Sequence, residues 1–207
     1  MAPDLVGRLL DAAVMTIRDH AEQLTALDQA IGDGDHGINM RRGFDAIAES
    51  RAQLACLPLD QALQKAGMTL VMRVGGASGP LYGSLLMAMG KAGAPQDVAG
   101  VAAAFEAGIE AVKKRGRSDV GAKTMLDVLV PTLGALQAGA ADGVAIGELS
   151  AKLRAVAEEA LAATAPMRAT KGRASFLGER SIGHLDPGAR SSALLIEAVC
   201  DVLEGDA

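Results

Sequence analysis

The stretch DLVGRLLDAAVMTIRDHAEQLTAL, residues 4–27, sets the fold class of this chain. Apolar side chains recur in it three and four residues apart, which is the spacing of one face of an α-helix, and charged side chains occupy the opposite face. The apolar positions are Leu5, Leu9, Ala13, Ile17, Leu24 and Leu27. A half-buried strand would need strictly alternating apolar residues, so we expect a long amphipathic helix here.

The same spacing recurs in seven further segments, which clusters of Gly and Pro separate. These segments are 37–54, 59–74, 79–91, 96–114, 122–138, 147–164 and 189–204. Pro131 is expected to kink its helix or to move the first turn of that helix to a later residue. Four methionines, Met68, Met72, Met87 and Met89, lie at helical spacing and are expected in the core. Residues 165–188 form one long connection.

The composition agrees with this pattern. Of the 207 residues, 50% are hydrophobic but only 2% are aromatic, so the chain lacks the side chains that strands favour. We therefore predict an all-α fold in which residues 1–207 form a single domain. Its eight helices should run up and down as an antiparallel bundle or barrel.

Charge and cysteine content limit the partners and the compartment. A net charge of -5 argues against nucleic acid and against an anionic membrane as partners. The two cysteines are too few for a disulfide scaffold. Asp4 and Arg8 interrupt any signal sequence at the start, and Arg73 and Pro80 interrupt the most hydrophobic stretch, 67–90. The sequence therefore predicts a cytoplasmic protein.

The order of the helices predicts where functional residues gather. If eight helices alternate in direction and the loops are short, connections 1, 3, 5 and 7 share one end of the bundle. Those connections are LDQAIGDGDHG (27–37), VGGASGP (74–80), KRGRSDVGAKT (114–124) and MRATKGRASFLGERSIGHLDPG (167–188). They hold the densest combinations of Asp, Gly, Ser, Lys and Arg, so function is expected at that end.

The first of these connections has the composition of a metal site. Asp28, Asp33 and Asp35 fall close together, and three carboxylates repel one another unless a cation or protons intervene. Oxygen ligands suit Mg²⁺ or Ca²⁺ rather than zinc. An EF-hand is excluded because Phe44 stands where its last ligand, a glutamate, should be. Mg²⁺ commonly shares phosphate oxygens with a substrate, which points to a nucleotide. The alternative is an Asp-rich turn that caps the next helix.

The other connections can surround phosphates. GGASG (75–79) precedes a helix and leaves bare N–H groups for an anion, although small residues also permit close helix packing. Residues 116–124 resemble a Walker A loop but carry one residue too many and follow no strand. Gly116, Lys123 and Thr124 can still line a nucleotide pocket.

The seventh connection supplies cations that would offset phosphate charge. Its charged side chains include Lys171, Arg173, Arg180, His184 and Asp186. Its length is unusual for a compact domain, and its Gly-rich frame suits a lid that closes over the nucleotide. The alternative is a solvated loop.

Four strings together resemble the nucleotide-binding L subunit of the dihydroxyacetone kinase family, over essentially the whole chain. The strings are LDQAIGDGDHGINMRRGF (27–44), GMTLVMRVGGASGPLYG (67–83), GAKTMLDVLVP (121–131) and KGRASFLGERSIGHLDPGARS (171–191). The resemblance implies an eight-helix antiparallel barrel with ADP or ATP and two Mg²⁺ ions at one end. It also implies that Asp28, Asp33 and Asp35 are the metal ligands.

The resemblance assigns the remaining site residues by position. The nucleotide-contacting turn corresponds to His36, Gly37, Ile38 and Asn39, and the phosphate loop to Ala77 and Ser78. The adenine side corresponds to Gly116 and Met125, and the closing loop to Arg173, Asp186, Pro187 and Gly188. The family often has Asp where this chain has Ala122, so no role of that Asp carries over. Lys123 is interpreted as a supporting residue and not as a catalytic one.

The resemblance implies a phosphotransferase. The chain would transfer a phosphoryl group from Mg-nucleotide to dihydroxyacetone held by a separate K subunit, with Asp28, Asp33, Asp35 and Arg173 as the catalytic residues. A phosphohistidine protein of the phosphotransferase system, the M subunit, would recharge the nucleotide, and a homodimer is possible. The alternatives are an ATP-dependent kinase subunit for dihydroxyacetone or another short ketose such as erythrulose, a non-catalytic nucleotide sensor, and a bundle without ligands.

Overall fold

The computed structural model describes residues 4–205, and between these residues it contains helices and no strand. The α-helices are α1 (Leu5–Ile31), α2 (His36–Glu49), α3 (Arg51–Ala55), α4 (Leu59–Arg73), α5 (Ser78–Lys91), α6 (Val98–Gly116), α7 (Leu126–Asp142), α8 (Ile146–Ala163) and α9 (Pro187–Glu204), with a 3-10 segment η1 (Arg173–Ser181). The predicted all-α fold is confirmed.

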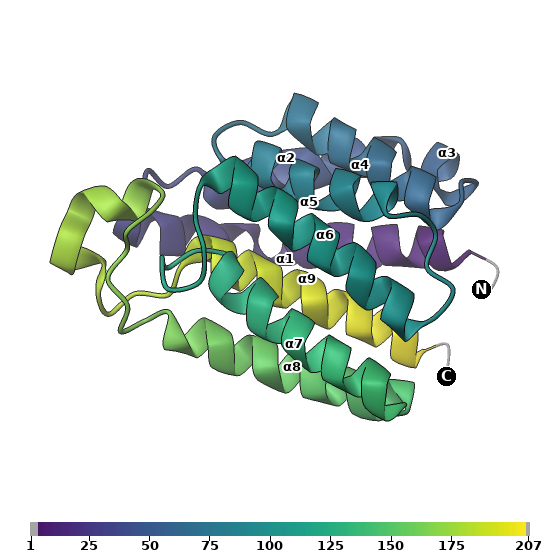
Figure 1. Ribbon diagram of the computed structural model, residues 1–207. Helices are drawn as coiled ribbons and strands as arrows, with labels where there is room; N and C mark the ends of the chain where they lie inside the picture. Colours follow the sequence, from purple (N-terminus) through teal and green to yellow (C-terminus); the bar gives the residue numbers. More distant parts are fainter. Residues whose placement is uncertain (1–3, 206–207) are drawn as a thin grey trace.

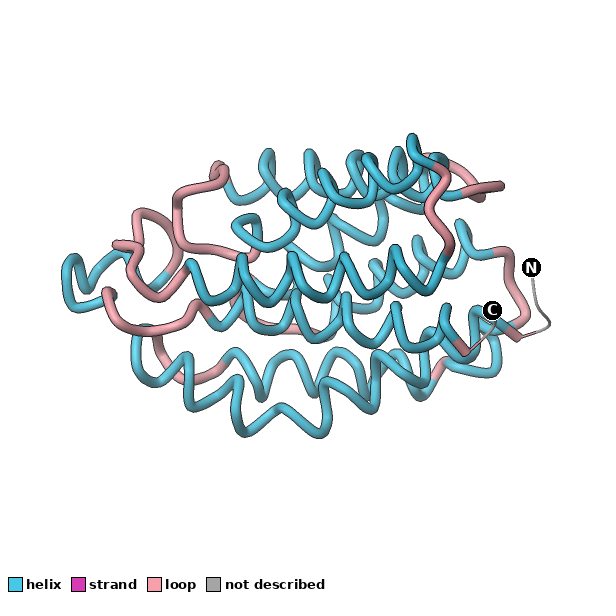
Figure 2. The backbone as a smooth tube through the Cα atoms, turned by 90° about the horizontal axis from the view of Figure 1, so that it is seen from below, coloured by secondary structure: helices cyan, strands magenta, loops and turns pink. Residues whose placement is uncertain are grey.

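The eight long helices form a closed ring. Each packs against the next long helix along the chain, and α9 packs against α1, so within residues 4–205 the ring has no open edge (Figure 1). Figure 2 shows the same helices from below, running side by side along one common axis. Buried side chains from around the ring, such as Ile17, Met40, Leu70, Ile109 and Leu126, fill its centre. The up-and-down arrangement expected from the sequence is confirmed.

The two ends of the barrel differ in character. The connections α1–α2, α4–α5, α6–α7 and α8–α9 lie at one end, on the left in Figure 1. The short turns before α4, α6 and α8 lie at the other end, together with the first turn of α1 and the last turn of α9. The prediction that the polar connections share one end is therefore confirmed.

Several helix boundaries differ from the expected ones. The first helix continues to Ile31, so Asp28 lies in its last turn and not in a connection. The reason is that Leu24, Asp28 and Ile31 keep one buried face at helical spacing. The segment 37–54 divides at Ser50 into α2 and α3. The helix with Pro131 begins at Leu126, later than the expected residue 122, but Pro131 lies inside this helix beyond its first turn, so the later start is not the shift expected from proline.

The long connection is more ordered than its composition suggested. It contains the 3-10 segment η1, which Gly178 interrupts with a φ of 60°. Ala169 and Ala174 are buried in a small cluster with Ile31, and Leu177 packs against this cluster. In Figure 1, η1 projects beyond the left end of the barrel. The connection is thus an ordered loop that packs against the end of α1 through its own small apolar cluster.

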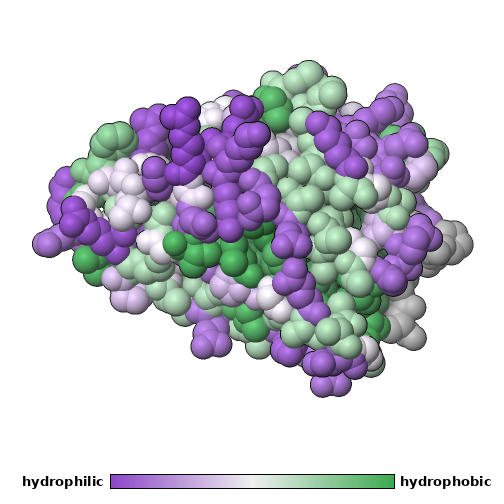
Figure 3. Space-filling view, in the orientation of Figure 1, coloured by the Kyte–Doolittle hydropathy of each residue, from purple (hydrophilic) through white to green (hydrophobic). Residues whose placement is uncertain are grey.

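The prediction that all four methionines lie in the core is wrong for two of them. Met68 is 55% exposed and Met72 is 68% exposed. The inward face of α4 is built from Ala62, Ala66 and Leu70 instead, and this leaves the methionines on the outer face. Figure 3 shows strongly hydrophobic groups lying among hydrophilic ones on the face it presents. Within residues 4–205, no helix is both long and apolar enough to cross a membrane.

Candidate functional site

Three carboxylates meet where α1 passes into α2. One oxygen each of Asp28, Asp33 and Asp35 lies within 4.8 Å of the others. The buried Asp28 also shapes the turn, because its Oδ2 accepts hydrogen bonds from the N–H groups of Asp35 (2.8 Å) and His36 (3.0 Å). The structure therefore brings together the three residues that the sequence singled out as metal ligands.

The donor set of this cluster suits a hard divalent cation. All three donors are carboxylate oxygens, which Mg²⁺ and Ca²⁺ prefer. The neighbouring His36 is not available as a ligand, because both its ring nitrogens are hydrogen-bonded to serine hydroxyls. Asp33 is exposed and Asp35 is half-buried, so solvent or a second ligand can complete the coordination. The chemistry of the residues present fits a magnesium ion.

The glycine loop before α5 both faces the acidic cluster and allows two helices to pack closely, the two interpretations considered from the sequence. Gly76 has a φ of 67°, and a Cβ at this position would lie 3.7 Å from an Asp35 carboxylate oxygen. Its bare backbone thus faces the acidic cluster and leaves room for a ligand. Gly79 lies against the Val74 carbonyl, so close that a Cβ would be 2.5 Å from the oxygen. Gly79 therefore permits the close packing of α4 and α5.

Four helices begin at one cavity. The residues just before α2, α5, α7 and α9 are Asp35, Ala77, Met125 and Asp186, and all four line a cavity of about 400 Å³. The N-terminus of a helix carries unpaired N–H groups and a partial positive charge, so each favours an anion. This cavity can therefore receive phosphates next to the carboxylate cluster.

His36 connects the cluster to two other segments. Its Nδ1 is hydrogen-bonded to the Ser78 hydroxyl (2.9 Å) and its Nε2 to the Ser191 hydroxyl (2.9 Å). Burial lowers the pKa of His36 to about 4, although the charge of Asp28 acts in the opposite direction. The imidazole is therefore neutral near pH 7, and it holds the Ser78 hydroxyl at the start of α5 by a hydrogen bond.

Tyr82 and Ser191 extend this network and were missed by the sequence reasoning. The Tyr82 hydroxyl is hydrogen-bonded to the hydroxyls of Ser191 (2.7 Å) and Ser192 (2.9 Å). Burial raises the pKa of Tyr82 to about 12, so it stays protonated. One signal was available, since Tyr82 is the only tyrosine of the chain and lies within the motif 67–83. The network ties α2, α5 and α9 together beneath the cavity.

Two further carboxylates organise the connections beside the cavity. Asp186 caps α9 by accepting the N–H of Ala189 (2.7 Å), and burial raises the pKa of Asp186 to about 7. Asp127, also missed from the sequence, accepts the N–H groups of Gly121 (2.6 Å) and Thr124 (2.7 Å). Both act on the backbone, so they fix the path of the chain around the cavity.

Arg173 lies over the acidic cluster. Its guanidinium forms an ion pair with Asp33 (3.1 Å), and the two side chains are 69% and 41% exposed. An exposed pair of this kind contributes little stability, so exchanging the carboxylate for a phosphate costs little. Arg173 lines the cavity together with Lys171, whereas Arg180 and His184 lie outside its lining.

Four residues assigned by resemblance are absent from the lining of this cavity. Gly37 packs against α1, where a Cβ would overlap the Ala21 carbonyl, and the buried Asn39 lies beside Gly75. Gly116 ends α6, and a Cβ there would be 3.4 Å from Leu81, a cavity residue. The side chain of Ile38 is 54% exposed and lines a different cavity.

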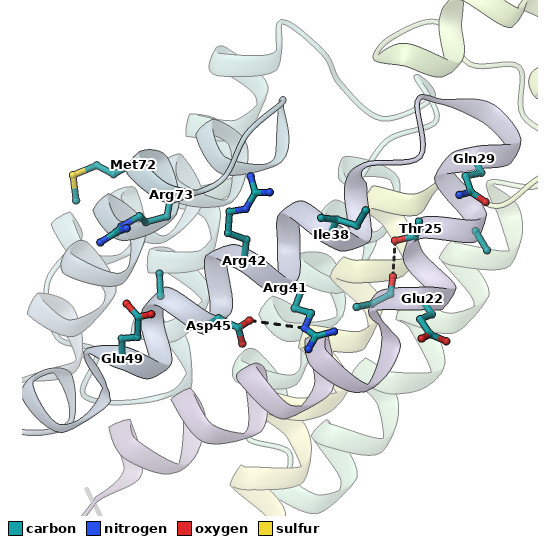
Figure 4. A pocket seen from close by; sticks show the side chains of 13 residues that line it. Glu22, Thr25, Gln29, Ile38, Arg41, Arg42, Asp45, Glu49, Met72 and Arg73 are labelled. Carbon is teal, nitrogen blue, oxygen red and sulfur yellow. Dashed lines mark hydrogen bonds and ion pairs between the residues drawn. The ribbon is translucent and has the colours of Figure 1, made fainter.

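The second cavity is larger but lacks a comparable arrangement. It measures about 810 Å³ and lies where α1, α2 and the end of α4 meet (Figure 4). Its lining carries both arginines and acidic side chains, and Arg41 approaches Asp45 to 3.9 Å. Among the described residues, three carboxylates converge only at Asp28, Asp33 and Asp35, so the candidate site is the cavity beside these three aspartates.

Comparisons with known proteins find similar sequences over most of the chain. The DAK2 domain matches residues 30–201. The chain is 47% identical to the ADP-binding subunit DhaL of the PEP-dependent dihydroxyacetone kinase 1 of Listeria innocua, with 88% of each chain covered. It is 39% identical to the corresponding subunit of Escherichia coli, with 86% of each covered.

Larger proteins contain a similar unit. The chain is 36% identical to part of a D-erythrulose kinase of Mycolicibacterium smegmatis, covering 95% of this chain and 35% of the kinase. The crystal structure of the dihydroxyacetone kinase of C. freundii in complex with AMP-PNP and Mg²⁺ superposes with a TM-score of 0.74 at 26% identity. That match covers 97% of this chain but spans only about a third (34%) of the crystallised one.

Proposed function

Because the chain belongs to the DAK2 domain family, we propose that it is the ADP-binding subunit of a PEP-dependent dihydroxyacetone kinase. In this role, residues 1–207 act as one nucleotide-binding domain that transfers a phosphoryl group to dihydroxyacetone on a separate K subunit. Three relatives named as the ADP-binding subunit DhaL of a PEP-dependent or PTS-dependent dihydroxyacetone kinase are matched over 86–91% of their own length, which supports the role of an ADP-binding subunit.

The observation that carries the proposal is the shared cavity at one end of the barrel. Three carboxylates, four helix N-termini and Arg173 all reach it, although they come from four different connections. A metal–nucleotide complex needs oxygen ligands for its cation and N–H or guanidinium donors for its phosphates. The cavity supplies both within one space, and among the described residues the only group of three converging carboxylates lies beside it.

Two Mg²⁺ ions would be held by Asp28, Asp33 and Asp35. When bound, Mg²⁺ would neutralise phosphate charge, which is a main requirement of phosphoryl transfer. The phosphates would lie at the N-termini of α2 and α5, near His36, Ala77 and Ser78. The adenine would lie toward Met125 and the end of α6, with Asp186–Gly188 and Arg173 closing the site.

The side chains of this chain would act by positioning and charge. Asp28 holds the metal-binding turn through two backbone N–H groups, and neutral His36 sets the direction of the Ser78 hydroxyl. Arg173 would leave Asp33 for a phosphate oxygen and offset the charge that develops there. No covalent step on the protein is required, because phosphoryl transfer depends mostly on alignment and electrostatics.

The partners follow from the same role. The acceptor would be the K subunit that holds dihydroxyacetone, and a phosphohistidine protein would recharge ADP while it stays bound. The names of the L. innocua and E. coli relatives support this, since both are PEP-dependent and ADP-binding. A homodimer stays a prediction that light scattering on the purified chain can test.

The first experiment is to denature freshly purified protein and identify any released nucleotide by chromatography, with and without earlier EDTA treatment. Near-stoichiometric ADP that disappears after EDTA supports the metal–nucleotide site and the PEP-dependent role. Protein that is empty but binds ATP reversibly with Mg²⁺ supports an ATP-dependent kinase instead. If neither nucleotide binds, the proposed function is wrong.

A second substrate deserves a direct comparison because of the D-erythrulose kinase relative, which matches 95% of this chain. Erythrulose and dihydroxyacetone would both be held by the partner, so the partner determines which one is phosphorylated. Transfer assays with K subunits loaded with each ketose distinguish the two. Transfer only to erythrulose would overturn the assignment to dihydroxyacetone while leaving the nucleotide site intact.

A further inference from the structure

The ammonium group of Lys123 is buried among backbone carbonyls. The side chain is 1% exposed, and its Nζ donates hydrogen bonds to the carbonyls of Ser181 (2.6 Å), His184 (2.6 Å), Met167 (3.0 Å) and Ala165 (3.3 Å). An ammonium has three N–H groups, so the two longer bonds share a donor or alternate. All four acceptors belong to the long connection between α8 and α9.

These carbonyls lie at the two ends of one excursion of the chain. Ala165 and Met167 precede residues 168–180, whereas Ser181 and His184 follow them. Two further hydrogen bonds join the two ends of the excursion, which we call its neck. The Gly183 N–H donates to the Ala165 carbonyl (2.8 Å), and the Ala169 N–H donates to the Ser181 hydroxyl (2.9 Å). The excursion therefore has the form of an Ω-loop, with its ends joined and Lys123 at the junction.

The backbone at Lys123 indicates that the ammonium is the reason for a lysine here. Its φ is 61°, in the left-handed region that favours glycine. Glycine would satisfy this backbone without strain but would leave the carbonyls without their shared donor. Buried carbonyls without partners are unfavourable, so a long side chain that ends in several N–H donors compensates for the strained backbone.

The excursion carries the cations of the candidate site. Between residues 168 and 180 lie Arg168, Lys171, Arg173 and Arg180 against the single acid Glu179, although the whole chain has a net charge of -5. Lys171 and Arg173 line the cavity, and Arg173 reaches Asp33. Contacts of Ala174 and Leu177 with Ile31 hold the rest of the excursion against α1. The neck thus determines where these cations stand.

We propose that Lys123 is a positioning residue that clamps the ends of the excursion 168–180, so that Arg173 stands over the acidic cluster before the nucleotide binds. This inference rests on the proposed function for the role of Arg173, but the clamp itself does not depend on that function. Lys123 lies in the lining of the cavity, yet its N–H donors are engaged by the neck, so it acts through the loop and not on the phosphates.

Hydrogen exchange tests the clamp without any ligand. Lys123→Met keeps the length of the side chain and removes the donors, while Lys152→Met, on the exposed face of α8, is the matched control. Backbone amides of residues 169–183 should exchange at least tenfold faster in Lys123→Met, and those of α1 and α5 should not change. Unchanged exchange in 169–183 overturns the clamp. If Lys123→Met does not fold, Ser181→Ala removes one bond of the neck and should give a smaller increase in the same residues; no increase contradicts the proposal.

A double-mutant cycle tests the link to Arg173, using transfer to the loaded K subunit. Arg173→Ala should lower the turnover number strongly in the wild-type background but less than twofold in Lys123→Met, because the guanidinium is already misplaced there. Lys123→Arg keeps a cationic donor and should restore part of the rate. If the double mutant instead loses turnover by the product of the two single-mutant factors, Lys123 does not act through Arg173. If the wild type transfers nothing, the proposed function fails, and the exchange result still decides the clamp.

Discussion

Replacing Asp35 by Asn should stabilise the metal-free protein while removing its response to magnesium. Oxygens of Asp28, Asp33 and Asp35 lie within 4.8 Å of one another. Two unit charges at that separation repel by about 0.9 kcal/mol even at the dielectric constant of water. Asp35 belongs to two of the three pairs, so its neutralisation removes about 1.7 kcal/mol of repulsion.

The position of Asp35 at the start of α2 subtracts from this gain. A negative charge at a helix N-terminus contributes about 0.3–1 kcal/mol, which asparagine loses. The net increase in the free energy of unfolding is therefore about 1 kcal/mol, or a rise in Tm of about 2–4 °C for a chain of this length.

Thermal unfolding followed by circular dichroism, in EDTA and in Mg²⁺ with ADP, measures both effects. Wild type should gain stability from the ligands by mass action, and Asp35→Asn should gain much less. Asp19→Asn makes the same charge change on the exposed face of α1 and should respond to the ligands like wild type. The reasoning is refuted if Asp35→Asn is less stable than wild type in EDTA, or if Mg²⁺ and ADP stabilise both proteins equally.

Three further predictions concern the stability of the fold. The raised pKa of Asp186, about 7, means that the folded protein keeps a proton that the unfolded chain releases near pH 4. The free energy of unfolding of wild type, relative to that of Asp186→Asn, should therefore fall as pH rises from about 4 to 7, by at most about 1.4 kcal/mol per pH unit. Urea unfolding at several pH values measures this difference. A difference in unfolding free energy that stays constant with pH contradicts the prediction. Gly37→Ala places a methyl group against the Ala21 carbonyl and should cost about 1–3 kcal/mol. Gly134→Ala, where the methyl group meets nothing within 4 Å inside α7, should instead stabilise by about 0.5–1 kcal/mol in the same urea assay.

The sequence was sufficient for the fold because its helices are strongly periodic and its loops mostly short. The stripe through Ile17 and Leu24 identifies α1, and alternating directions then place four polar connections at one end without any distance information. The acidic cluster followed in the same way, since Asp28, Asp33 and Asp35 are near in sequence as well as in space. The predicted end of α1 was wrong for a related reason. Asp28 belongs to the buried stripe of the helix, but its polar side chain indicates a connection when only the apolar spacing is considered.

The remaining features depend on the path of the backbone in space. The partners of Lys123 are carbonyls 42–61 residues away, and a carbonyl has the same chemistry at every residue, so no sequence pattern identifies them. The contact of His36 with Ser191 joins residues 155 positions apart for the same reason. The exposure of Met72 shows a different limit: a helical stripe of small residues, around Ala66, can form the core-facing side while larger apolar groups face outward.

The polarity of the helix ends explains why a cation site and an anion site lie side by side. In an up-and-down barrel, each functional connection joins the C-terminus of one helix to the N-terminus of the next, so partial negative and positive charges alternate around that end. Asp28 lies in the last turn of α1, where a cation is favoured, and the starts of α2 and α5 lie beside it, where an anion is favoured. A nucleotide without its metal would bring phosphates against three carboxylates, and a metal without the nucleotide would lack phosphate oxygens. Each ligand therefore raises the affinity for the other by the same factor, and removing the metal should release the nucleotide.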